Sequence, residues 1–259
     1  MADVSLLNQI LAIAPAFEKI AAQCTRMESV FILSRNDGCI LGSLASPLRY
    51  TRAGHVALAW TKDLTLRLSN RGIPLAISYG ETGADGSVID GVEFVDRQGR
   101  GCLKICRTDP VSKEQWAQML SICGKYRLPG DTLSCLRKTN HLEGSATCSH
   151  CAAESRVSHP RTPSAKTLET FLCNAIDDRQ SIEILAPCGL AKARMTIRPH
   201  SLQWRGEWLI PTDTNTCCHL RMAPGTHVVR RIGAASQILD IFDAGSRLVA
   251  RLTKPNPTL

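Results

Sequence analysis

Apolar positions along the chain follow two spacings in turn. Residues 6–22 place apolar side chains three and four positions apart, which predicts an amphipathic helix. Residues 30–106 consist of short apolar segments divided by turn signals such as the Asn-Asp-Gly run at 36–38. This pattern predicts successive β-strands and hairpins. Residues 113–126 return to helical spacing, so the first part of the chain is predicted to hold a helix, a sheet and a second helix.

The middle of the chain follows neither spacing. Residues 128–163 are rich in Ser, Thr, Gly, Pro and Cys and have no sustained periodicity, which predicts a flexible linker. A further helix is predicted after Pro163, with Ser164 as its cap. We therefore expect an N-terminal half at residues 1–127, the linker at 128–163, and a C-terminal half at 164–259.

The C-terminal half repeats features of the N-terminal half. Three segments of the first half have counterparts of similar pattern, in the same order, in the second: 29–33 with 181–185, 66–68 with 219–221, and 94–96 with 241–243. A repeat of this kind predicts an approximate two-fold relation between two structurally related halves. The expected fold class is α+β, with each half a large, mostly antiparallel β-sheet with flanking helices.

Composition narrows the class of protein. The 259 residues are 44% hydrophobic, yet no apolar run approaches the roughly 18 residues that span a bilayer. The first residues lack the basic start and the small-residue cleavage site of a secretory signal, and we expect a cytoplasmic protein without membrane insertion. The twelve cysteines are scattered through this long chain, so reduced, mostly buried thiols are predicted rather than a disulfide framework.

The net charge of +8 favours an anionic partner. A small anionic ligand, a nucleic acid or an acidic protein would each satisfy that charge, so charge alone does not choose among them. Nucleic acid is disfavoured, because aromatic residues make up only 5% of the chain and no helix-turn-helix, finger or aromatic-basic stripe is found.

Several motifs together resemble one protein family. Residues 54–58 followed by 63–68 read Gly-His-Val-Ala-Leu and then Asp-Leu-Thr-Leu-Arg-Leu, which is similar to the "G-H-x-G-L … D-L-R-L-F" stretch of HemS-like proteins. Residues 91–105 resemble the "Q-F-F-D-x-x-G-x-x-x-H-K" hairpin of that family. In the second half, residues 206–221 and 236–252 resemble its "G-P-W … L-H-L-R" and "T-S-L-E-L-F-D" stretches. On these motifs the chain resembles the bacterial hemin-degrading and hemin-transport factors.

The resemblance implies a function and a ligand. It implies a cytoplasmic protein of haem uptake and iron acquisition that holds haem between its two halves for transfer or degradation. A haem transporter or a haem-accepting enzyme is the implied partner, and an oxygenase-like opening of the haem ring is an open second expectation. The alternative is a haem-inactive scaffold or regulatory protein that acts through protein contacts.

The resemblance also nominates residues for haem binding. Arg67 matches the arginine of the family's "D-L-R-L" strand, and Arg231 falls near its "R-K-P-T" stretch, so both are expected near the haem propionates. His55, His219 and Arg221 are further candidates, and the last two share one face of a predicted strand because they stand two positions apart.

One family element is missing from the chain. The "T-D-x-H-x-F-F" helix that carries the iron-ligating histidine in relatives has no counterpart, since residues 162–175 already resemble the helix that follows it. The linker in its place holds a cluster of potential ligands: His141, Cys148, His150, Cys151 and His159. Three interpretations stay open for this cluster: a solvated tether, a replacement axial ligand for haem, or a zinc site. The lone C-x-x-C supplies only half of a structural zinc site.

Overall fold

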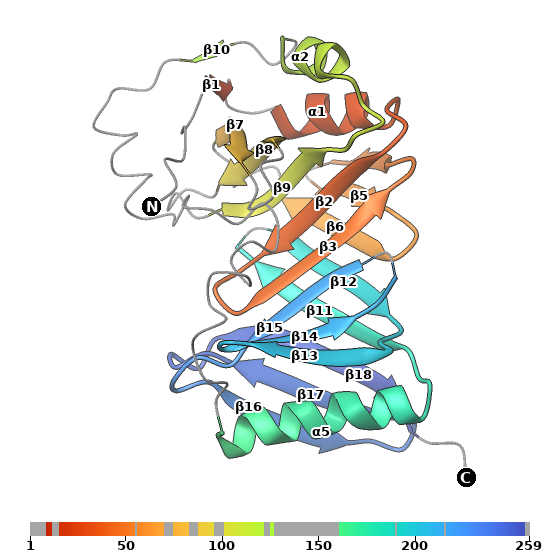
Figure 1. Ribbon diagram of the computed structural model, residues 1–259, viewed down its shortest axis with the longest axis vertical. Helices are drawn as coiled ribbons and strands as arrows, with labels where there is room; N and C mark the ends of the chain where they lie inside the picture. The colour runs from red at the N-terminus through yellow and green to blue at the C-terminus, as the bar shows by residue number, and fades with distance from the viewer. Residues whose placement is uncertain are drawn as a thin grey trace.

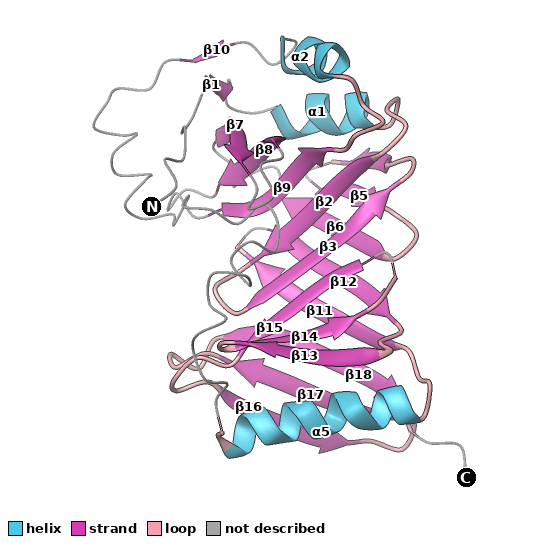
Figure 2. Cartoon of the chain, in the orientation of Figure 1, coloured by secondary structure: helices cyan, strands magenta, loops and turns pink. Residues whose placement is uncertain are grey.

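The computed structural model describes two stacked antiparallel sheets and three helices (Figures 1 and 2). The described residues are 9–11, 16–54, 56–69, 75–82, 88–95, 101–121, 125–126, 161–189, 191–214 and 216–256. The ten-stranded sheet has the order β10 (Lys125–Tyr126), β1 (Gln9–Leu11), β7 (Leu75–Thr82), β8 (Val88–Val95), β9 (Gly101–Arg107), β2 (Val30–Arg35), β3 (Cys39–Ala45), β15 (Thr216–Arg221), β14 (Trp208–Thr212) and β13 (Ser201–Arg205).

The second sheet has eight strands. Its order is β16 (His227–Ile232), β17 (Ser236–Phe242), β18 (Leu248–Pro255), β11 (Ile182–Cys188), β12 (Ala191–Ile197), β6 (Leu64–Ser69), β5 (Val56–Trp60) and β4 (Arg49–Ala53). The helices are α1 (Ala16–Cys24), α2 (Lys113–Ser121) and α5 (Pro163–Asp177). The predicted α+β class with large antiparallel sheets is therefore confirmed.

Each sheet takes strands from both halves of the chain. In the N-terminal half, β7, β8, β9, β2 and β3 lie in the ten-stranded sheet, while β6, β5 and β4 cross to the other sheet. The C-terminal half has the same arrangement with the sheets exchanged, since β16, β17, β18, β11 and β12 lie in the eight-stranded sheet and β15, β14 and β13 cross over. The duplication therefore extends to the topology of these eight strands in each half, while β10 and β1 have no counterpart among the described strands of the eight-stranded sheet. Figure 1 shows orange and blue strands side by side in the front sheet.

The two halves meet inside the sheets. In the ten-stranded sheet, β3 pairs with β15, and in the eight-stranded sheet β12 pairs with β6. We call the β12–β6 junction the seam of the eight-stranded sheet. A ligand that contacts both halves can therefore do so on the outer face of one sheet, without entering the space between the sheets.

The space between the sheets is the hydrophobic core. Strand β11 alternates strictly, with Ile182, Ile184 and Ala186 fully buried and the residues between them partly exposed. Strand β6 alternates in the same way, as expected for a sheet with one face on a core. Close-packed side chains from both sheets fill this space, so it leaves no room for a porphyrin.

Helix α5 closes one end of the sandwich. It packs against β13 and β16, which are edge strands of the two sheets (Figure 1), and it buries Leu168, Phe171 and Leu172. Its N-cap is Thr162, whose hydroxyl accepts a hydrogen bond from the backbone N–H of Ala165 at 3.1 Å. The predicted cap, Ser164, is wrong because Pro163 occupies the first helical position, where its fixed φ suits the helix and its missing N–H is not needed.

The other predicted helices are shorter than expected. Of the predicted helix over residues 6–22, residues 9–11 form strand β1, which pairs with β7 and β10, and the helix begins at Ala16. Likewise α2 ends at Ser121, before the two residues of β10. Apolar spacing could not reveal either strand, because three residues are too few to show a period. Most of the predicted linker lies outside the described residues.

Candidate functional site

The outer face of the eight-stranded sheet carries a row of cations beside apolar side chains. Because alternate residues of β6 enter the core, Thr65 and Arg67 point outward. The strand register places Arg67 opposite Lys192 of β12 on one side and Leu58 of β5 on the other. Lys192 in turn stands opposite Pro187 of β11. We call Pro187, Lys192, Arg67 and Leu58 the Arg67 row.

Arg67 and Lys192 form a like-charged cross-strand pair at the seam. Both side chains are exposed, and neither has an ion-pair partner within the described part of the chain. Like charges placed directly opposite one another destabilise a sheet. An anion bound at the seam would remove this repulsion, so the pair marks a favourable position for a carboxylate or phosphate group.

Apolar side chains flank the cations on both sides. Leu58 and Trp60 of β5 lie beyond Arg67, and Leu185 and Pro187 of β11 lie beyond Lys192; all four are partly exposed. They share the outer face with Arg67, since the residues that alternate with them are buried. The face therefore presents partly exposed apolar side chains on both sides of a positively charged centre, which suits a large apolar ligand that carries carboxylates.

Arg231 lies on the same face but far from Arg67. It stands on β16, five strands from β6, or about 24 Å at the usual strand spacing. Its guanidinium donates to Asp240, which also accepts from Arg251 at 2.6 and 3.1 Å. Burial alone would raise the pKa of Asp240, but the hydrogen bonds and charges of Arg251 and Arg231 outweigh it and lower that pKa. The structure therefore does not bring the two predicted arginines together.

His219 and Arg221 lie on the opposite outer face. Both are on β15 of the ten-stranded sheet, where His219 pairs with Ile40 and is 3% exposed. The Nε2 atom of His219 is 3.2 Å from the Sγ atom of Cys217. The guanidinium of Arg221 pairs with Glu207 at 3.0 Å. These two candidates therefore form a separate cluster, on the far side of the core from Arg67.

The remaining predicted ligands lie outside the described residues. These are His55 and the linker residues His141, Cys148, His150, Cys151 and His159. Within the described ranges, no group of three or more His, Cys, Asp or Glu side chains could hold a metal ion. Seven of the described cysteines are free thiols, and five of these seven are buried. Burial raises the pKa of Cys188 to about 12, so its thiol stays protonated.

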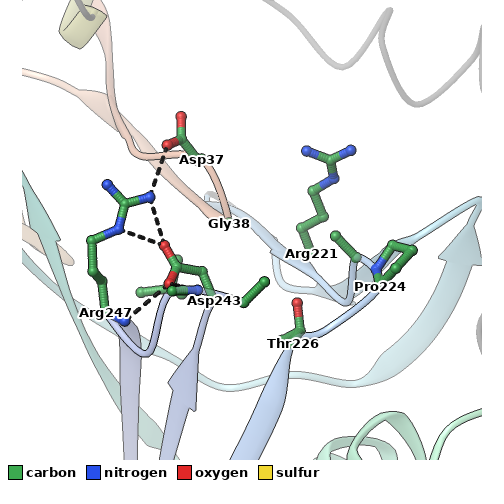
Figure 3. A pocket seen from close by; sticks show the side chains of 11 residues that line it. Asp37, Gly38, Arg221, Pro224, Thr226, Asp243 and Arg247 are labelled. Atoms are coloured by element: carbon green, nitrogen blue, oxygen red, sulfur yellow. Dashed lines mark hydrogen bonds and ion pairs between the residues drawn. The ribbon is translucent and has the colours of Figure 1, made fainter.

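A small pocket lies where three turns of the chain meet (Figure 3). Its volume is about 230 Å³, below the roughly 300–1,000 Å³ of ordinary ligand pockets. Asp243 accepts from the backbone N–H groups of Gly245 and Arg247 at 2.9 Å and from the Arg247 guanidinium. These contacts give Asp243 a structural role in the turn, and the pocket is too small for a porphyrin.

Sequence reasoning missed Lys192. The signal is visible in β12, where small apolar residues and the basic residues Lys192 and Arg194 alternate, but nothing local shows that this strand pairs with β6. The significance of Lys192 depends on that long-range pairing with Arg67.

The comparisons with known proteins fit this architecture. Residues 5–122 match the family model of the haemin-degrading HemS.ChuX domain. This match lies within the N-terminal part of the chain and covers slightly less than half of its residues. This confirms the resemblance to HemS-like proteins on which the sequence-based expectations rest. No curated protein sequence matches the chain.

Solved structures share the fold of this HemS-like chain over nearly its whole length. The haem-degrading enzyme ChuS of Escherichia coli O157:H7 superposes with a TM-score of 0.70 at 16% identity, covering 97% of this chain and 82% of that one. Holo-PhuS, a haem-binding protein from Pseudomonas aeruginosa, gives 0.67 at 15% identity, covering 97% and 83%. At such identities the likeness establishes the fold alone. None of the described helices is long and apolar enough to cross a membrane.

Proposed function

We propose that this HemS-like protein binds haem on the outer face of its eight-stranded sheet, with Arg67 and Lys192 meeting the propionates. The observation that carries the proposal is the unneutralised Arg67–Lys192 pair at the seam, flanked by partly exposed apolar side chains. Haem combines a large apolar plate with two carboxylates, so it matches both features of the face. The HemS.ChuX match in the N-terminal part of the chain and the named activities of ChuS and PhuS support the choice of ligand.

The geometry favours carriage of haem over its degradation. Ring opening needs a bound iron, oxygen and a site that controls water. The described part of the face is open, with the Arg67, Lys192 and Arg194 side chains exposed. Such a face lets haem arrive and leave without disturbing the core. A cytoplasmic role in iron acquisition, with a haem transporter or a haem-accepting enzyme as partner, stays a prediction from the sequence.

A haem-inactive scaffold is the second candidate. It is favoured by edge strand β16, where Val229 and Ile232 are 43% and 69% exposed, because exposed apolar side chains on a sheet edge are typical of protein contacts. A scaffold of this kind would show no saturable uptake of hemin, and that result separates it from a haem carrier.

Hemin titration with charge-reversed variants tests the proposal. The full chain is expected to give a saturable Soret band, and Arg67→Glu and Lys192→Glu are each expected to weaken binding by tenfold or more, or about 1.4 kcal/mol. Lys166→Glu on α5 is the matched control, since it makes the same charge change at an exposed helical position and is expected to leave affinity unchanged. Equal affinities for all four proteins would overturn the proposed site.

A further inference from the structure

The proposed haem face needs a donor for the iron, and Arg67 and Lys192 are not suited to that role. Haem iron in proteins is bound by imidazole, thiolate, thioether or phenolate groups. The described strands of the eight-stranded sheet hold four side chains of these classes: His227, Cys188, Met195 and Tyr50. Met195 is fully buried, and Tyr50, opposite buried Ala59, packs against the core. Cys188 is fully buried in the core. His227 is exposed and lies on the outer face, because it pairs with outward-facing Phe242.

The ring of His227 is held in place without using its nitrogens. It stacks on Phe242 with a centroid separation of 5.1 Å and an interplanar angle of 12°. Neither ring nitrogen has a hydrogen-bond partner within the described ranges. A stacked ring loses less side-chain freedom when it binds a ligand, and free nitrogens leave a lone pair for a metal.

His227 stands in line with the Arg67 row. The register runs from His227 to Phe242 and then, across a β-bulge, from Phe242 to Leu248. Beyond the junction of β18 with β11, it runs from Pro187 to Lys192 and Arg67. The side-chain amide of Asn36 joins the two parts, since it donates to the carbonyl oxygens of both Pro187 and Val249 at 2.8 Å. Phe242, Leu248 and Pro187 are partly exposed, so the floor between the histidine and the lysine is apolar.

The length of this row fits one haem. Strands β16 and β12 are four strand spacings apart, or about 19 Å between backbones. Such a distance would accommodate an imidazole below the iron at one end, propionates that extend in the porphyrin plane toward the other end, and an ammonium that reaches inward to meet them. The apolar floor then lies beneath the porphyrin.

We propose that His227 ligates the haem iron, with Lys192 and Arg67 meeting the propionates at the other end of the row. This inference rests on the proposed haem-binding function and adds the donor atom. The imidazole of His227 coordinates through a neutral nitrogen, so no redox step is involved. The imidazole of His219 and the thiol of Cys217 also lie close together, but on the opposite face, so they cannot reach a haem held by Arg67.

Absorption and electron paramagnetic resonance spectra of the hemin complex test the assignment in the full chain. His227→Ala is expected to lose the imidazole-ligated spectrum and at least tenfold in affinity, and added imidazole is expected to restore the spectrum. His200→Ala is the matched control, because His200 is exposed and adjoins β13 of the other sheet. Lys192→Glu is expected to weaken affinity while the bound fraction keeps the ligated spectrum.

The outcomes separate the two claims. If the wild-type chain takes up no hemin in a saturable manner, the proposed function and this inference both fail. If the wild type binds but His227→Ala gives an unchanged spectrum, only the assignment of His227 is overturned. A spectral change in a Cys148, His150 and Cys151 triple variant, with none in His227→Ala, would assign the iron ligand to the linker instead.

Discussion

Reversing the charge of Lys192 should make the haem-free protein more stable while it weakens haem binding. In the wild type, Lys192 faces Arg67 directly across the seam, with no described acidic partner for either. Lys192→Glu would replace this repulsion with an attractive pair at the same positions. When a residue serves ligand binding at a cost in stability, its replacement is expected to raise the stability and to lower the affinity for the ligand.

The size of the gain follows from the geometry of the pair. A cross-strand charge pair contributes roughly 0.2–1 kcal/mol in either direction, so removal of the repulsion and gain of the attraction together stabilise by about 0.5–2 kcal/mol. For a chain of this length, that corresponds to a rise of about 2–6 °C in the melting temperature. Both side chains are exposed, so 1 M salt, with a Debye length of about 3 Å, should remove most of the difference.

Urea unfolding of the haem-free protein at low and high salt measures this effect. Wild type and Lys192→Glu are compared by the urea midpoint at constant slope. Lys192→Glu is expected to have the higher midpoint at low salt only. A midpoint at or below that of the wild type, or a gain that persists in 1 M salt, would refute the electrostatic account of the seam.

Three further predictions concern stability. Ile184→Ala should cost about 2–5 kcal/mol and its neighbour Leu185→Ala less than about 1 kcal/mol, since they lie on the core and outer faces of β11; similar losses in urea unfolding would contradict the assigned faces. Asp240→Asn should cost about 1–2 kcal/mol at pH 7, a figure reduced because Arg231 and Arg251 are 52% and 39% exposed. The folded pKa of Asp240 is below its ordinary 3.8, so the stability that the Asp240 carboxylate contributes is present above that value and is lost as pH falls through the folded pKa. Urea titrations between pH 2 and 7 should therefore show a smaller loss of stability on the acid side for Asp240→Asn than for the wild type. Parallel curves for the two proteins would contradict this role of Asp240. Thr162→Ala should cost about 1 kcal/mol through loss of the α5 cap, and an unchanged thermal midpoint would exclude that role.

The sequence was enough to predict the duplicated fold, because the signals are local. The alternation in β11 and β12 and the matched segments of β2 with β11, β6 with β15, and β8 with β17 can be read along the chain. The acid–base pair Glu93 with Lys104 has its counterpart in Asp240 with Arg251, again at equivalent strands. Equivalent residues in the two halves thus keep equivalent places in the topology.

The site could not be predicted in full, because the two halves exchange strands. Arg67 of β6 and His219 of β15 occupy equivalent positions, since Arg67 pairs with Lys192 of β12 and His219 pairs with Ile40 of β3. Since each of these strands crosses to the other half's sheet, the equivalence places Arg67 and His219 on opposite faces of the sandwich. A sequence repeat shows which residues correspond, but not that corresponding residues lie far apart. The pairing of β12 with β6, which brings Lys192 to Arg67, likewise depends on tertiary structure.

Tryptophan fluorescence lifetimes in the hemin complex test most directly which face holds the haem. Trp60 lies on the outer face of β5, two strands from Lys192, whereas Trp208 lies on the opposite outer face beside Arg221. In variants that retain one tryptophan each, bound haem is expected to shorten the lifetime of Trp60 far more than that of Trp208. Stronger quenching of Trp208 would contradict the placement of haem on the eight-stranded sheet.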